Sequence, residues 1–84
     1  MESILLIVRS VTQAQLMERA LSNAGIRASI SRTPMELTGG SGCTYAVRIA
    51  PEELPAAIQI INGTGLRPAK IYASDSLGYR EVAT

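Results

Sequence analysis

Apolar and polar positions along the chain predict two strand–helix–strand halves. Residues 4–9 are almost uniformly apolar and rich in β-branched side chains, which predicts a strand in the interior of a sheet. Ser10, with Gln13 three positions later, matches the start of a helix that Gly25 ends. Apolar residues recur between them at three- and four-residue spacing and predict one buried stripe, made of Ala14, Met17, Ala20, Leu21 and Ala24.

The second half repeats this arrangement. Polar and apolar residues alternate over residues 27–31 and again over residues 45–49, which predicts an edge strand followed by a further strand. Pro51 and the two acids after it predict a helix start, and the Asn and Gly residues within 62–65 predict its end. The buried stripe of this helix is expected to consist of Leu54, Ala57, Ile58 and Ile61.

The order of these elements predicts the fold class. With residues 69–73 as a fourth strand, the chain follows the ferredoxin-like βαββαβ pattern. We therefore expect an α+β domain over residues 1–73, with a four-stranded antiparallel sheet and both helices on one face. Residues 74–84 form a polar tail, expected to be either disordered or an extra edge strand. The first strand is apolar on both faces although the helices cover only one, so we expect a homodimer through the open sheet face.

Composition narrows the classes of function. The 84 residues, 46% of them hydrophobic, suffice for one domain, and eight Lys and Arg against seven Asp and Glu give a net charge of +1. This near-neutral charge removes the electrostatic argument for nucleic-acid or anionic-membrane partners. The chain has no histidine and one cysteine, which excludes histidine-dependent catalysis, an internal disulfide and Cys-x-x-Cys chemistry. We expect neither a metal nor a cofactor.

The beginning of the chain lacks the pattern of an export signal. Five apolar residues follow Glu2 and Ser3, so the apolar run has no basic leader and is too short to span a membrane. A single unpaired thiol also fits a reducing compartment. We therefore expect a cytoplasmic protein.

The connection over residues 33–44 carries the cysteine. It contains a proline and three glycines and is long for a domain of this size, which favours a functional role. In the predicted topology its end lies beside the first strand and the start of the first helix. A helix N-terminus and nearby guanidinium groups stabilise a thiolate, the nucleophilic form of cysteine. Cys43 is therefore the candidate reactive residue, and the candidate binding residues around it are Arg9, Ser10, Arg32, Gly40, Ser41, Gly42 and Thr44.

The cysteine, the glycines and several charged and aromatic residues also have purely structural interpretations. A lone cysteine is often a packed small hydrophobe, and glycine-rich segments are often simple turns. Arg27, Arg48 and Lys70 are spread over several strands and are expected to be solvated or paired, whereas Tyr45 and Tyr72 are expected to pack on the sheet. RNA recognition is disfavoured because the predicted central strands offer no Phe or Trp for base stacking. Copper binding lacks a second thiol.

Several of these segments, taken in order, resemble the selenium/sulfur carrier-like family of small bacterial domains. They are the first strand, the helix end at residues 21–26, the Thr33-Pro34 opening of the connection, and Cys43 followed by residues 45–49. The resemblance covers most of residues 3–73. It implies a cytoplasmic ferredoxin-like domain whose cysteine holds sulfur or selenium as a persulfide-type adduct and hands it to a partner.

Two hypotheses for the function follow. In the first, the protein is a carrier rather than a stand-alone enzyme, and Cys43 takes sulfur or selenium from a donor protein and passes it to an acceptor protein. This hypothesis predicts a thiol pKa below the value of about 8.5 for free cysteine. In the alternative, the protein is a non-catalytic dimeric interaction or ligand-sensing module that uses the open sheet face or the glycine-rich connection.

Overall fold

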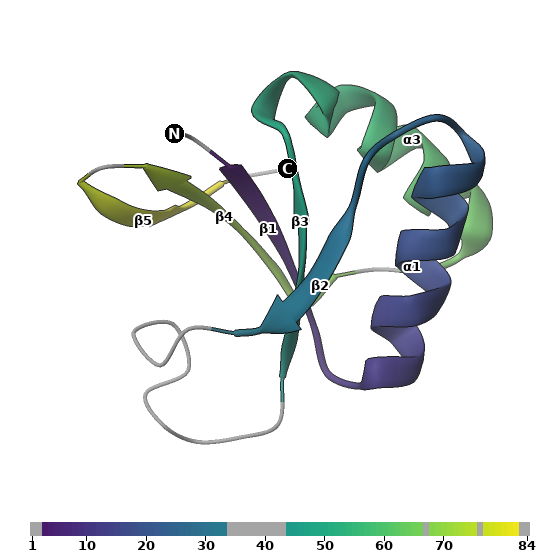
Figure 1. Ribbon diagram of the computed structural model, residues 1–84, viewed down its shortest axis with the longest axis horizontal. Helices are drawn as coiled ribbons and strands as arrows, with labels where there is room; N and C mark the ends of the chain where they lie inside the picture. Colours follow the sequence, from purple (N-terminus) through teal and green to yellow (C-terminus); the bar gives the residue numbers. More distant parts are fainter. Residues whose placement is uncertain (1–2, 34–43, 67, 76, 83–84) are drawn as a thin grey trace.

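The computed structural model describes residues 3–33, 44–66, 68–75 and 77–82 (Figure 1). In chain order these form β1 (Ser3–Val8), α1 (Val11–Asn23), β2 (Ser29–Arg32), β3 (Tyr45–Ile49), the 3-10 helix η1 (Pro51–Glu53), α3 (Leu54–Thr64), β4 (Lys70–Asp75) and β5 (Gly78–Glu81). Four of the predicted site residues lie outside the described residues, namely Gly40, Ser41, Gly42 and Cys43.

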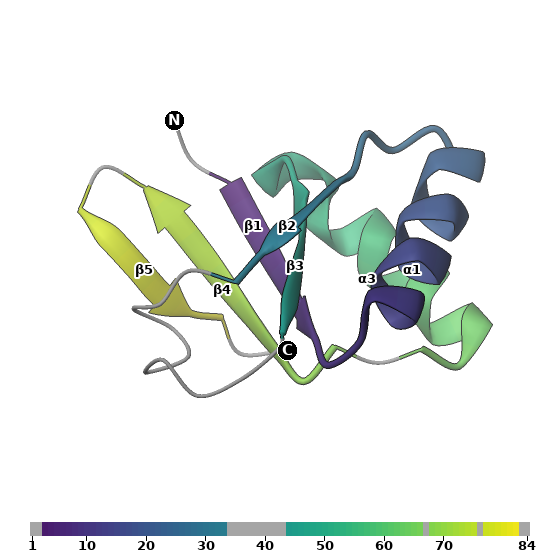
Figure 2. The ribbon, with the colours of Figure 1, turned by 60° about the horizontal axis from the view of Figure 1, so that its bottom comes forward.

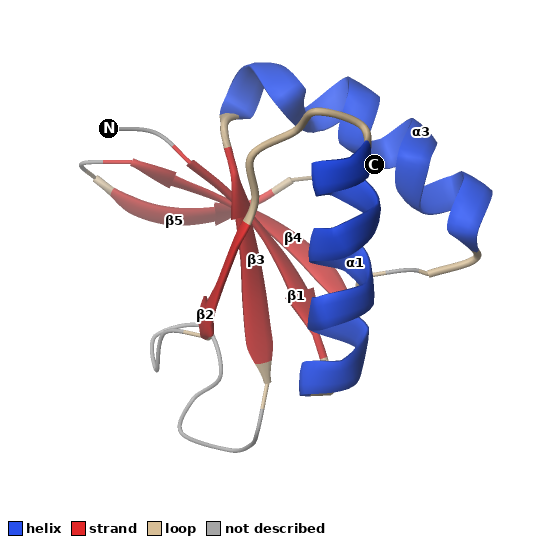
Figure 3. Cartoon of the chain, turned by 45° about the vertical axis from the view of Figure 1, so that its right-hand side comes forward, coloured by secondary structure: helices blue, strands red, loops and turns tan. Residues whose placement is uncertain are grey.

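The described strands form one antiparallel sheet in the order β2-β3-β1-β4-β5. β1 occupies the middle, where Leu6 pairs with Val47 of β3 on one side and with Ile71 of β4 on the other. Both helices lie on one side of the sheet (Figures 1, 2 and 3). The protein is therefore an α+β domain, and the central place of β1 explains its unbroken apolar sequence.

α1 begins and ends where the sequence predicts. Ser10 is its N-cap. At the other end Gly25 has a φ of +87°, the left-handed conformation that glycine adopts most easily. The Gly25 N–H donates to the Ser22 carbonyl at 3.0 Å, and the Ile26 N–H donates to the Leu21 carbonyl at 2.9 Å. These two hydrogen bonds make a Schellman motif, which satisfies two carbonyls of the last turn.

α3 ends within the predicted range of residues 62–65. Gly63 lies inside the helix rather than ending it, and Gly65, with a φ of +79°, is the C-cap. The Thr64 hydroxyl links the last turn to the chain that follows, because it donates to the Ile61 carbonyl at 2.8 Å and accepts from the Leu66 N–H at 3.3 Å. These contacts stabilise the last turn of α3 beside Gly65, one of the predicted stop residues.

The main hydrophobic core lies between the helices and the sheet. Of the predicted α1 stripe, three residues are buried, whereas Ala20 is half-buried and Ala24, at the C-cap, is exposed. Every second residue of β1 points into this core. The buried members of the core are Ile4, Leu6, Val8, Ala14, Met17, Leu21, Ile26, Val47, Ile49, Ala57, Ile61, Ile71 and Ala73.

A second, smaller apolar cluster lies on the opposite face of the sheet. Leu5 and Ile7, the alternate residues of β1, are 0% and 6% exposed and are joined there by the buried Ala46. Tyr72 and Tyr79 pack against them. The second face of β1 is therefore already covered within a single chain. The homodimer stays a prediction. An uncovered apolar face on β1 cannot be the reason for it, because this face is covered by the chain's own residues.

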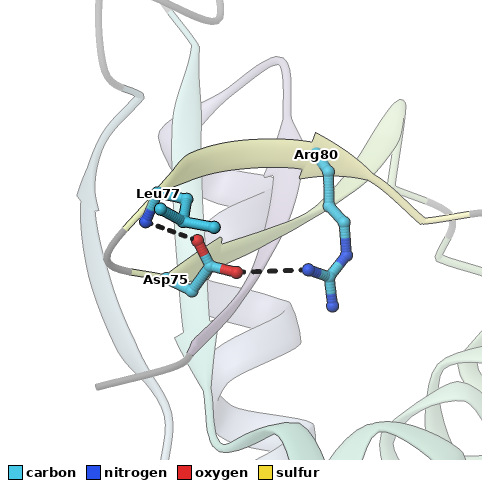
Figure 4. A network of polar contacts seen from close by, with 3 residues as sticks. All are labelled: Asp75, Leu77 and Arg80. Atoms are coloured by element: carbon cyan, nitrogen blue, oxygen red, sulfur yellow. Dashed lines mark hydrogen bonds and ion pairs between the residues drawn. The ribbon is translucent and has the colours of Figure 1, made fainter.

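Within the described residues the sheet has five strands rather than the predicted four, because the chain reverses after β4. Asp75 shapes this turn: its Oδ1 accepts the Leu77 N–H at 2.8 Å, and its Oδ2 lies 3.2 Å from Nη1 of Arg80 (Figure 4). Gly78, opposite Asp75 in the register, has a φ of +121°. An Asp that accepts from the residue two positions later favours a turn, and glycine permits the positive φ. β5 therefore pairs with the outer edge of β4.

Candidate functional site

The described residues predicted to form the site lie at one end of the sheet. The register pairs Val8 of β1 and Arg32 of β2 with the same residue of β3, Tyr45. β1, β2 and β3 therefore reach this end at the same level, beside the start of α1 (Figure 3). We call the residues at this end the rim: Arg9, Ser10, Arg32, Thr33 and Thr44.

Thr44 occupies the middle of the rim. β3 lies between β1 and β2, and continuing the β1–β3 register by one residue places Arg9 opposite Thr44. On the other side, the Thr33 N–H donates a hydrogen bond to the Thr44 carbonyl at 3.3 Å. Arg9 directly follows β1 and Arg32 is the last residue of β2, and these two strands are two apart in the sheet, a separation of roughly 9–10 Å. The two arginines therefore flank the chain that enters β3.

Two hydroxyl groups of the rim have unused hydrogen-bonding capacity. The Oγ1 atoms of Thr33 and Thr44 are shielded from solvent and have no hydrogen-bond partner in the described part of the chain. Burying a hydroxyl without a partner costs free energy, about 1–3 kcal/mol in mutational data. Thr33 and Thr44 therefore carry two hydroxyl groups whose hydrogen-bonding capacity the described residues leave unmet.

Ser10 caps the N-terminus of α1. Its Oγ accepts the Gln13 N–H at 3.1 Å, and its carbonyl accepts the Ala14 N–H at 3.1 Å. The amides of Val11 and Thr12 precede the intrahelical ladder, so they remain for water or for a neighbouring group. The first turn of α1 contains no acid, so its partial positive charge is not neutralised there.

The charged side chains of the rim are basic. Arg9 and Arg32 are exposed, and neither forms an ion pair with another described residue. Lys70 begins β4 beside the rim, but its Nζ lies 4.0 Å from Oε1 of Glu81 and both side chains are more than half exposed. Such a pair is worth little in stability. The charged side chains in the described part of the rim are therefore all positive.

Four predicted site residues share this end of the sheet: Arg9, Ser10, Arg32 and Thr44. Thr33 is not among the predicted site residues, although its backbone N–H donates to the Thr44 carbonyl where the connection begins and ends. The sequence signal for it was present, because threonines stand at both borders of the glycine-rich segment. The placement of Cys43 and of its glycine-rich neighbours falls outside the described residues.

The described residues contain no metal-binding cluster. Nowhere among them do three or more Asp, Glu, Cys or His side chains come together in a way that could hold an ion. Nor does any helix in these same segments have the length and apolar character needed to cross a membrane.

The fold and the rim together define a small α+β domain with a basic sheet end next to a cysteine-bearing connection. The chain belongs to the family described as "putative Se/S carrier protein-like", whose family model matches residues 3–73. The match spans β1 through most of β4, including Cys43, and ends before β5. No curated protein and no solved structure gave a match.

Proposed function

We propose that this protein is a sulfur or selenium carrier that uses Cys43 as the attachment point. Membership of the Se/S carrier-like family, with the chain's single cysteine inside the matched region, carries this proposal. The donor and the acceptor are other proteins, and the setting is cytoplasmic. We also propose the ferredoxin-like class for the fold, which the order β2-β3-β1-β4 supports, with β5 as an addition.

The rim explains why an anionic sulfur species would be favoured beside it. Cys43 directly precedes Thr44, and consecutive Cα atoms are about 3.8 Å apart. Thr44 itself lies between Arg9 and Thr33. A thiolate or persulfide anion near this point gains from the guanidinium groups, the start of α1 and the two unused threonine hydroxyls.

The transfer needs no external oxidant or reductant. The Cys43 thiolate attacks the outer sulfur of a persulfide on the donor protein. A new S–S bond forms at Cys43, the donor S–S bond breaks, and the donor cysteine leaves as a thiolate. The acceptor thiolate then attacks the outer sulfur on Cys43 in the same way, which regenerates the free Cys43 thiolate.

Mass spectrometry of the intact protein tests loading. After incubation with a persulfide-generating cysteine desulfurase and cysteine, the protein is expected to gain the mass of one sulfur atom, which dithiothreitol removes. Cys43→Ser should gain nothing. A protein that stays unmodified, or a Cys43→Ser variant that gains the same mass, would contradict the proposal.

The rate of alkylation against pH tests the electrostatic part. The thiol pKa is expected to lie below about 8.5, and Arg9→Gln and Arg32→Gln should each raise it. Arg19→Gln is the matched control, because it removes the same charge from an exposed site on α1. A wild-type midpoint at or above 8.5 would remove the basis for the rim's role.

A further inference from the structure

A groove of about 720 Å³ lies at the end of the sheet opposite the rim. Its lining comes from the last turn of α1 and the chain that leads into β2, from the end of β3, and from the first residue of β1. Its polar lining consists of Ser3, Ser22, Arg27, Ser29 and Arg48. Thr44 and Arg48 are four residues apart on one extended strand, or about 13 Å. The groove is therefore separate from the rim.

Two arginines share this groove without a counter-charge. Ser29 pairs with Arg48 in the β2–β3 register, and Arg27 lies two residues before Ser29. Both guanidinium-bearing side chains are exposed, and neither forms an ion pair with a described residue. The described lining contains no acidic side chain. Two like charges in one groove repel each other, so an anion bound between them would be stabilised by both.

The surrounding groups favour an oxyanion. The negative end of α1 opposes an anion here, and the Schellman motif limits this effect because it pairs the carbonyls of Leu21 and Ser22. The serine hydroxyls supply neutral donors, and guanidinium groups bind phosphate and carboxylate oxygens in a bidentate manner. Ile26, Ala28 and Ile49 add apolar lining next to these polar groups.

We propose that the groove binds a small phosphate monoester with an apolar substituent. A phosphate dianion matches the two guanidinium charges and offers more acceptor oxygens than a carboxylate. The volume suits a small molecule, since ligand sites commonly range over about 300–1,000 Å³. This site is independent of the carrier function proposed for Cys43.

A titration of the ¹⁵N-labelled full chain with phenyl phosphate tests the site. At low salt, saturable amide shifts are expected at Arg27, Ser29 and Arg48, and added salt should weaken them. Benzoate tests the ligand class and should bind at least fivefold more weakly. Shifts that do not saturate, shifts confined to the rim, or equal binding of benzoate would overturn the proposal.

Matched charge variants assign the binding to the two arginines. Arg27→Gln and Arg48→Gln are each expected to weaken phenyl phosphate binding about fivefold, the upper range for an exposed ion pair. Arg19→Gln lowers the net charge equally but lies outside the groove, so its affinity should stay within twofold of wild type. The ¹⁵N spectrum of each variant establishes that it is folded. An equal loss in Arg19→Gln, or no loss in either groove variant, would refute the assignment.

Discussion

Replacing the rim threonines with valine is expected to stabilise the protein. The Oγ1 atoms of Thr33 and Thr44 are shielded from solvent and unpaired among the described residues. Valine keeps the branched shape and replaces the hydroxyl by a methyl group, so the desolvation cost disappears. Both residues are only half-buried as a whole, which places the gain at the low end of the range, about 1 kcal/mol for each substitution.

The measurement is urea unfolding of the full chain, together with thermal unfolding. A gain of about 1 kcal/mol corresponds to a rise in Tm of roughly 4–8 °C for a domain of this size. Thr64→Val is the matched control with the opposite sign. It removes a hydroxyl that donates to Ile61 and accepts from Leu66, and it should cost about 1 kcal/mol.

The sign of the stability change in Thr33→Val and Thr44→Val tests this reasoning. If Thr33→Val and Thr44→Val destabilise the protein as Thr64→Val does, their hydroxyls have partners and the rim offers no spare donors. If they stabilise it, the same variants should load sulfur on Cys43 more slowly than wild type. Functional sites often keep groups that lower stability because the same groups support activity.

Two further predictions concern packing and backbone conformation. Gly63→Ala, inside α3 with open space at its Cβ, should stabilise the protein by up to about 1 kcal/mol, whereas Gly25→Ala should cost about 1 kcal/mol because its φ is +87°. Chemical denaturation that gave both variants the same sign would contradict this. Leu5→Ala should lower the free energy of unfolding by about 2–5 kcal/mol, because Leu5 is fully buried within a single chain. Leu77→Ala is the control: Leu77 is 95% exposed, so its loss should change stability by less than about 0.5 kcal/mol. A small effect of Leu5→Ala in a monomer would show that the second cluster contributes little.

Local sequence signals predicted the helices and central strands well. The N-cap Ser10 and the left-handed Gly25 lie where the pattern places them, because each satisfies backbone groups only a few residues away. β3 has its predicted bounds of Tyr45–Ile49. Of the residues that predict the end of α3, Gly63 lies inside the helix, because a single glycine only weakens a helix, whereas Gly65 is the C-cap.

Features that depend on distant parts of the chain were harder to predict. β5 needed a partner edge on β4 as well as the Asp75 turn, and the turn signal alone left open whether the strand would form. The cover over Leu5 depends on Tyr72 and Tyr79, which lie more than sixty residues later. The groove was missed for the same reason. Arg27 precedes β2 and Arg48 lies in β3, and each looks like an ordinary solvated charge when viewed alone.

The two border strands of the sheet bear on how the protein behaves at high concentration. β2 and β5 are each four residues long, and most of their side chains are polar. Short, charged borders make poor templates for strand addition by another molecule. The longer apolar strands β1 and β3 are paired on both sides. Ribbon-like polymerisation through backbone pairing is therefore disfavoured, and deleting β5 would turn the six-residue β4 into an open border.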